Sequence, residues 1–155
     1  MENMLFYAHS GIRWIVILAA IVAIGYFVFG LLTKRAYDRP AGLLLTIFVR
    51  SMEIQWLLGL IVLVVQGLDN ATPAKWTHLG IMTVALVIAH AYMAFRKRPD
   101  NVKYVGGLGV IAVTLVAVVI GVSALGGNRW SFTPTGMGSS AAEDVPAVEV
   151  TESAS

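Results

Sequence analysis

The chain contains three histidines, and two of them begin long apolar segments. His9 lies in YAHSGIRW and His78 lies in KWTHLGI. Imidazole is a common ligand of haem iron, and two inward-facing histidines on different helices can hold an iron porphyrin from opposite faces. Arg13 follows His9 by about one helical turn and is suited to pair with a haem propionate. The pattern predicts a haem b site with His9 and His78 as metal ligands and Arg13 as a further cofactor contact.

A simpler interpretation of these two histidines stays open. A histidine at a membrane interface can hydrogen-bond lipid headgroups or water without any cofactor. At about 1.5 Å of rise per residue, His9 lies about 37 Å before Lys34 and His78 about 27 Å before Arg96. Tilt or unequal helix ends must absorb the difference if the two side chains are to meet. Met82, one turn from His78, is a weaker alternative ligand.

His90, in AHAYMAF, lies nearer the other end of the apolar segment that begins near His78. It follows His78 by twelve residues, which is about 18 Å of helical rise, so the two cannot bind one iron. A neighbouring apolar segment is expected to reach the same level with a group of polar residues. These residues, in VRSMEIQW, are Arg50, Ser51, Glu53 and Gln55.

Three interpretations of this inner polar group remain open. Arg50 and Glu53 are spaced to form an i,i+3 ion pair, with His90 as a hydrogen-bonding neighbour. Alternatively, His90 and Glu53 exchange protons in a proton-conducting or quinol-facing cluster. A second haem bound by His90 is the third interpretation, although glutamate is not a usual haem ligand.

The elements that must position these residues are membrane-spanning helices. Of 155 residues, 57% are hydrophobic and 13% are charged, and the mean hydropathy is +0.77. Such a chain is too apolar for one soluble core, which indicates an integral membrane protein. Four segments are long enough to span a bilayer as helices: Leu5–Thr33, Ala41–Gly67, Pro73–Phe95 and Tyr104–Leu125. The predicted fold is all-α, an integral membrane antiparallel four-helix bundle over residues 1–125.

The tail from residue 126 to 155 differs in composition from the bundle. Small, polar and acidic residues replace long apolar ones. Such a segment cannot bury enough apolar surface to offset the entropy of ordering it. We therefore expect residues 126–155 to be a flexible, disordered extracytoplasmic tail.

The positions of the basic residues predict the topology. Eight of the eleven lie toward one side of the bundle: Lys34, Arg35, Arg39, Arg50, Arg96, Lys97, Arg98 and Lys103. Basic loops face the cytoplasm, so both termini are expected outside the cytoplasmic (inner) membrane. Trp14, Trp76 and Trp130 then fall at the outer interface, as an aromatic belt would.

Two functional classes are excluded by composition. The bases flank apolar segments rather than covering one polar face, which argues against a nucleic-acid partner and for membrane lipid. The absence of cysteine excludes iron–sulfur clusters, thiolate metal sites and covalently attached c-type haem.

Three stretches carry a family resemblance: HSGIRW, SMEIQWLLGL and HLGIMTVALVIAHAYMAFRKR. The sequence over about residues 5–125 resembles small uncharacterised bacterial four-helix membrane proteins related to b-type cytochromes. The bundle is also similar to one half of haem A synthase. The resemblance implies that His78 and His9 ligate b-type haem. Some members carry histidine where this chain has Glu53, which implies an altered inner site. Haem A synthase places a glutamate close to a haem-ligating histidine, which this chain lacks, so synthase activity is not expected.

The leading hypothesis is therefore a b-type cytochrome-like membrane protein that passes electrons, from quinol to a partner. The alternative is a non-catalytic accessory or assembly subunit of a larger respiratory or photosynthetic membrane complex. Glycines that permit close helix approach favour this alternative: Gly25, Gly30, Gly59, Gly106, Gly107, Gly109 and Gly121.

Overall fold

The computed structural model describes residues 2–126, which form four long helices and two short 3₁₀ helices, with no strand in this described part. The elements are α1 (Glu2–Leu32), α2 (Arg39–Val65), η1 (Leu68–Asn70), α3 (Pro73–His90), η2 (Ala91–Phe95) and α4 (Asp100–Ser123). The all-α prediction is confirmed. The predicted tail beyond Gly126, with Arg129 and Trp130, lies outside the described residues.

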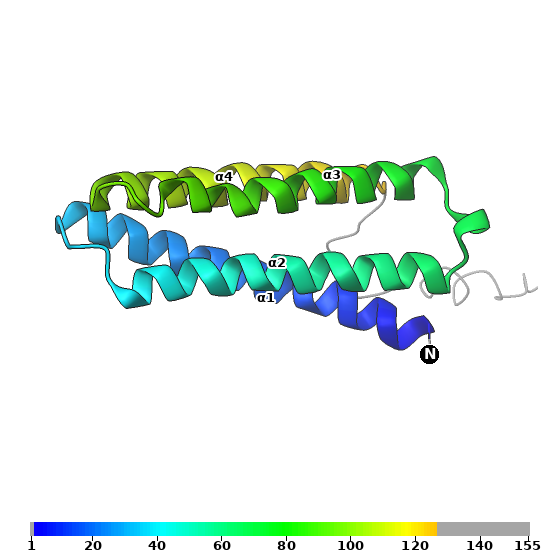
Figure 1. Ribbon diagram of the computed structural model, residues 1–155. Coiled ribbons are helices and arrows are strands. Elements are labelled where there is room, and N and C mark those ends of the chain that lie inside the picture. The colour runs from blue at the N-terminus through cyan, green and yellow to red at the C-terminus, as the bar shows by residue number, and fades with distance from the viewer. Residues whose placement is uncertain (1, 127–155) are drawn as a thin grey trace, which may run out of the picture.

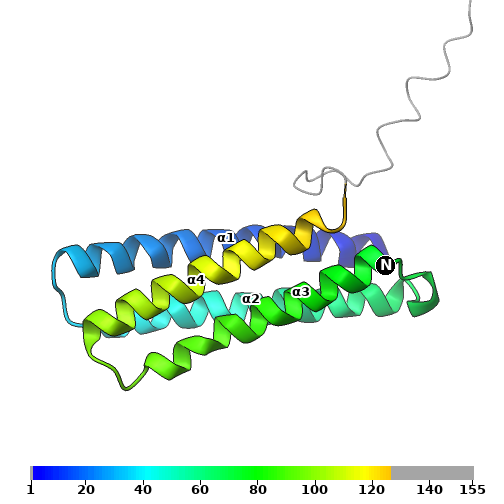
Figure 2. The same ribbon diagram turned by 90° about the horizontal axis from the view of Figure 1, so that it is seen from above.

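The four helices lie side by side along a common long axis (Figures 1 and 2). α1 packs against α2 and α4, and α3 packs against the same two helices, so α1 and α3 are diagonal to each other. The connections 33–38 and 96–99 lie at one end, here called the basic end (Figure 1). The connection 66–72 and the N-terminus lie at the other end, here called the far end. Side chains of the diagonal helices can therefore meet across the centre.

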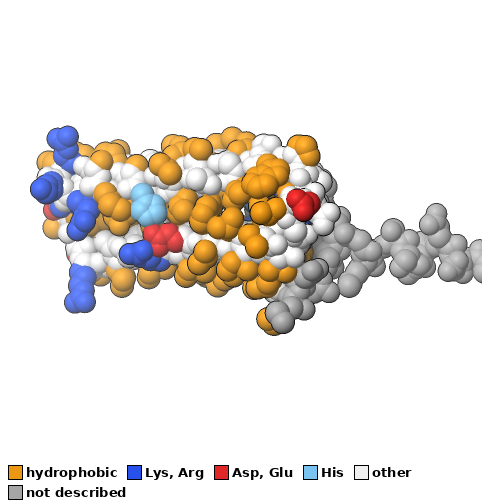
Figure 3. Space-filling model, turned by 45° about the vertical axis from the view of Figure 1, so that its right-hand side comes forward, with side chains coloured by type: hydrophobic (Ala, Val, Ile, Leu, Met, Phe, Trp, Pro, Cys, Tyr) orange, Lys and Arg blue, Asp and Glu red, His pale blue; other side chains and the backbone are white. Residues whose placement is uncertain are grey.

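All four helices are long and apolar enough to cross a membrane, with α3 and η2 forming one span over Pro73–Phe95. Large apolar side chains on every helix are exposed, and Figure 3 shows them spread over the surface. Examples are Leu18, Val64, Val87 and Val116. The interior combines large side chains such as Phe27, Phe48 and Tyr104 with small residues. The small residues Ala20, Ala23, Ala85 and Ala89 are each fully buried. Apolar outer surfaces with small residues at helix contacts are typical of membrane bundles.

The turn between α1 and α2 is organised by Asp38. Its Oδ1 accepts a hydrogen bond from the backbone N–H of Ala41 at 3.1 Å, which caps α2. Its Oδ2 accepts from the Tyr26 hydroxyl at 2.7 Å and pairs with Arg35 at 2.9 Å. The hydrogen bond from Tyr26, helped by Ala41 and Arg35, lowers the pKa of Asp38. This polar turn starts α2 at Arg39, two residues before the apolar run that predicted it.

Two further boundaries differ from the prediction. The span Pro73–Phe95 does not continue as one α-helix, because the backbone tightens into the 3₁₀ helix η2 after His90. α4 begins at Asp100 instead of Tyr104, since polar residues just outside an apolar run can still form the first helical turn. Thr72 occupies the N-cap position of α3, and its side chain makes no capping hydrogen bond.

Candidate functional site

A cavity of about 420 Å³ lies between the four helices toward the far end. Both His9 on α1 and His78 on α3 line it, together with Gln55 and Gly59 on α2 and Val118 on α4. Its volume lies within the range of about 300–1,000 Å³ typical of cofactor and small-molecule sites. The two histidines therefore share one chamber, here called the histidine cavity.

His78 is fixed by a backbone atom of α4. Its Nδ1 lies 2.6 Å from the carbonyl oxygen of Gly121. A carbonyl oxygen only accepts, so Nδ1 donates, and the other ring nitrogen, Nε2, carries a lone pair in neutral imidazole. Gly121 is in the last turn of α4, where helix carbonyls lack their usual backbone partner. A backbone carbonyl of α4 thus orients the histidine.

His9 lies against α2. Its Nε2 is 3.4 Å from the side-chain amide nitrogen of Gln55, and its Nδ1 is buried with no hydrogen-bond partner among residues 2–126. A Cβ on Gly59 would meet the imidazole Cε1 at 2.8 Å, so the ring needs a glycine there. A buried imidazole nitrogen without a partner is costly, so a further hydrogen-bonding or ligated group at this position would stabilise the ring.

Two cationic residues line the same cavity. Arg13 is one turn after His9, with its guanidinium carbon 5.9 Å from the centre of the Trp14 ring. Lys75, in the first turn of α3, donates through Nζ to the side-chain oxygen of Gln66 at 2.9 Å. Positive side chains beside a mostly apolar chamber suit a ligand with anionic groups on an apolar body.

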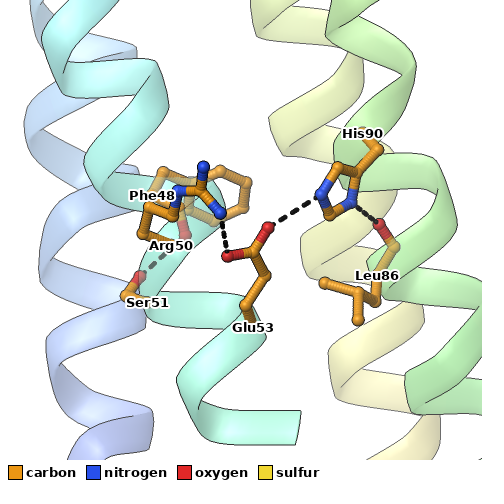
Figure 4. Close-up of polar contacts among 6 residues, drawn as sticks. All are labelled: Phe48, Arg50, Ser51, Glu53, Leu86 and His90. Carbon is orange, nitrogen blue, oxygen red and sulfur yellow. Dashed lines mark hydrogen bonds and ion pairs between the residues drawn. The ribbon is translucent and has the colours of Figure 1, made fainter.

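The inner polar group forms a chain of contacts between α2 and α3 (Figure 4). Arg50 Nη1 donates to Glu53 Oε2 at 2.6 Å, which is the i,i+3 pair expected from the sequence. Glu53 Oε1 lies 2.9 Å from His90 Nε2, and His90 Nδ1 lies 2.8 Å from the carbonyl oxygen of Leu86. Ser51 does not join this chain, because its hydroxyl donates to the carbonyl of Phe48.

The contacts of His90 constrain the protons in this group. Both imidazole nitrogens face oxygen atoms that accept hydrogen bonds. Favourable geometry at both needs two protons, either both on the His90 ring or one on the ring and one on Glu53. The cluster is partly exposed, with side-chain exposures of 70% for Arg50, 29% for Glu53 and 33% for His90. It is partly open to the outside of the bundle, and none of its three residues lines the histidine cavity.

Sequence reasoning misplaced one residue and overlooked others. The expectation that Gln55 lies at the inner level with Arg50 is wrong, because its amide contacts His9. Gly59 and Gly121 were visible only as small packing positions. A signal was present: Gln55 and Gly59 on α2 and Gln66 directly after it follow a helical spacing along the face that lines the cavity. No comparable spacing in the sequence marked Lys75 as a cavity residue.

Among residues 2–126, no group of three or more His, Asp or Glu side chains is placed to hold a bare metal ion. Comparisons with protein-family models, curated proteins and solved structures gave no match for this chain.

Proposed function

We propose that the chain is a membrane-spanning b-type cytochrome-like protein that binds one haem b in the histidine cavity. His9 and His78 would hold it, one from each of the diagonal helices α1 and α3. The helices form an antiparallel bundle in the cytoplasmic membrane, with the basic end inside and both termini outside. The bound haem supplies one-electron redox chemistry, and the chain passes electrons from quinol to a partner.

One observation carries this proposal: two histidines from diagonal helices line one chamber of about 420 Å³. Residues near the ligands fit the same role. The Gly121 carbonyl holds the His78 Nδ1 proton, leaving Nε2 as the ligating atom. Such outer hydrogen bonds fix ring orientation and raise ligand basicity at metal sites. The second supporting feature is the buried Nδ1 of His9, which has no hydrogen-bond partner among residues 2–126.

The remaining lining residues have separable tasks. Arg13 supplies a positive charge for a propionate, and Lys75 supplies a second one nearer the connection 66–72. Apolar side chains such as Val118 and Met82 exclude water from the macrocycle and thereby influence the potential. Gln55 occupies the position beside His9 Nε2, so ligation by that atom requires its amide to turn away.

A detergent-purified protein tests the proposal. Haem binding predicts a reduced-minus-oxidised difference spectrum of the low-spin b type, with about one haem per chain by pyridine haemochrome assay. A well-folded protein that stays colourless after expression with ample haem, and after reconstitution with haemin, would contradict it.

A second candidate, a non-catalytic accessory subunit of a larger membrane complex, is favoured by the position of the inner polar group. Figure 3 shows a histidine, an acidic and a basic side chain together on an otherwise apolar surface. Charged groups inside a membrane usually face a partner or an aqueous space. Copurification of the colourless chain with a larger assembly, lost when Glu53 is replaced, would favour this candidate over the cytochrome.

A further inference from the structure

A second cavity, of about 570 Å³, lies at the basic end of the molecule. Its walls come from the connection 33–38, the first turns of α2, the helix η2 with Arg96, and the first turns of α4. It shares no lining residue with the histidine cavity. We call it the basic hollow. It is independent of the proposed haem site.

Three cationic side chains line the basic hollow: Arg39, Arg96 and Lys103. Lys103 Nζ donates to Asp100 Oδ1 at 3.0 Å, so its charge is already balanced. Neither Arg39 nor Arg96 makes an ion pair with any residue in 2–126. Two guanidinium groups that line one hollow and lack an ion-pair partner within residues 2–126 repel each other. An anion bound between them would offset this repulsion.

The other lining residues are compatible with an anion that carries an apolar portion. Burial raises the pKa of Tyr37 to about 12, so its phenol stays neutral and adds no negative charge. Leu43, Leu45 and Phe95 supply apolar wall beside the cations. Gly42 leaves its part of the wall open, since a Cβ there would meet only the Tyr37 ring, at 3.8 Å.

We propose that the basic hollow binds a phosphate group between Arg39 and Arg96, carried either by an anionic phospholipid headgroup or by a soluble phosphate. Guanidinium groups match the geometry of phosphate oxygens through paired hydrogen bonds. Basic pockets between transmembrane helices on the cytoplasmic side bind anionic headgroups. The neighbouring apolar wall is where the first carbons of an acyl chain would lie.

The test uses the full chain in detergent, with binding measured from the rise in melting temperature on titration. The probes are phosphatidylglycerol, phosphatidylcholine, and inorganic phosphate against sodium chloride of equal ionic strength. The variant R39Q/R96Q removes both free cations. The control K34Q/R98Q makes the same change in net charge at the same end, at positions that do not line the hollow. The variant Gly42→Leu fills the hollow and keeps every charge.

We expect phosphatidylglycerol to bind more tightly than phosphatidylcholine, and R39Q/R96Q to weaken it roughly tenfold or more. Gly42→Leu should weaken it as well, and K34Q/R98Q should leave it nearly unchanged. Stabilisation by inorganic phosphate that depends on Arg39 and Arg96 would identify a soluble phosphate as the occupant. Lipid binding without a phosphate effect would identify the headgroup. The proposal is overturned if the control pair weakens binding as much as R39Q/R96Q, or if neither probe binds in preference to its reference.

Discussion

His78 on α3 is held by Gly121 on α4: the imidazole Nδ1 lies 2.6 Å from the glycine carbonyl oxygen. The contact depends on a close approach of the two helices. A Cβ at position 121 would overlap the methyl group of Met82 and press on Ile81. The missing side chain of Gly121 therefore allows its carbonyl to reach the histidine.

Gly121→Ala should misplace His78. Overpacking costs about 1–3 kcal/mol, and the better helix propensity of alanine offsets about 1 kcal/mol of that. We expect a modest loss of stability and about tenfold weaker haem retention, as for other lost outer hydrogen bonds to metal ligands. Haem content and melting temperature measure the two effects. Gly109→Ala, on the same helix with nothing near its Cβ, is the matched control and should retain haem fully.

Gly59→Ala probes the other proposed ligand. The added methyl group would lie 2.8 Å from Cε1 of His9, so the imidazole must move. We expect the low-spin spectrum to weaken or convert to high spin, because one axial ligand is displaced. Gly25→Ala adds the same methyl group to α1 in open space and should have no spectral effect. Equal spectra for the two variants would argue that His9 is not a ligand.

The four long helices could be predicted from the sequence, because apolar runs of that length form helices in a membrane chain. The ends of these helices were harder to predict. Asp38 and Pro40 start α2 in a polar stretch, and η2 replaces the last α-helical turn after His90. Those details depend on local caps and hydrogen bonds that hydropathy does not report.

Only part of the candidate site could be predicted from the sequence. Histidine stands out in an apolar helix, so His9 and His78 could be singled out by type alone. Gln55 was assigned to the wrong level, since the tilt of α1 against α2 sets which residues meet. The carbonyl of Gly121 leaves no trace in a residue pattern, because every residue carries one.

The capping carboxylate Asp38 predicts a pH dependence of stability. Its folded-state pKa is lowered, chiefly by the Tyr26 hydroxyl. Its contribution is therefore present above the unfolded-state pKa and is lost as the pH falls through the lower, folded-state pKa. We expect Asp38→Asn to lower the melting temperature by a few degrees at pH 7, with the difference from the parent shrinking under acid conditions.

Asp69→Asn is the control for this titration. Asp69 lies in η1, and its side chain makes no hydrogen bond or ion pair with any residue in 2–126. The Asp69→Asn variant should have the same melting temperature as the parent at every pH. In Tyr26→Phe, the loss of melting temperature on acidification should begin at a higher pH than in the parent. The reason is that the hydrogen bond that chiefly lowers the pKa of Asp38 is gone. If the melting temperature of Tyr26→Phe falls at the same pH as that of the parent, a group other than Asp38 controls the loss of stability in acid.

Glu53→Gln tests whether the inner polar group is structural. The change removes the charge that pairs with Arg50 and faces His90 while keeping the shape of the side chain. We expect a melting temperature lower by a few degrees and quinol-linked activity close to that of the parent. Thermal melts and a quinol oxidation assay separate the two outcomes. A folded Glu53→Gln variant with abolished turnover would instead favour a proton-relay role for Glu53 and His90.

The central claim is that His9 and His78 hold one haem, and the spectrum of three alanine variants tests it most directly. His9→Ala and His78→Ala each remove one proposed ligand, so the low-spin b-type spectrum should be lost or converted in both. His90→Ala removes a histidine that contacts Glu53 outside the histidine cavity, so its spectrum should match that of the parent. An unchanged spectrum in His78→Ala, or loss of the spectrum in His90→Ala, would contradict haem binding by His9 and His78.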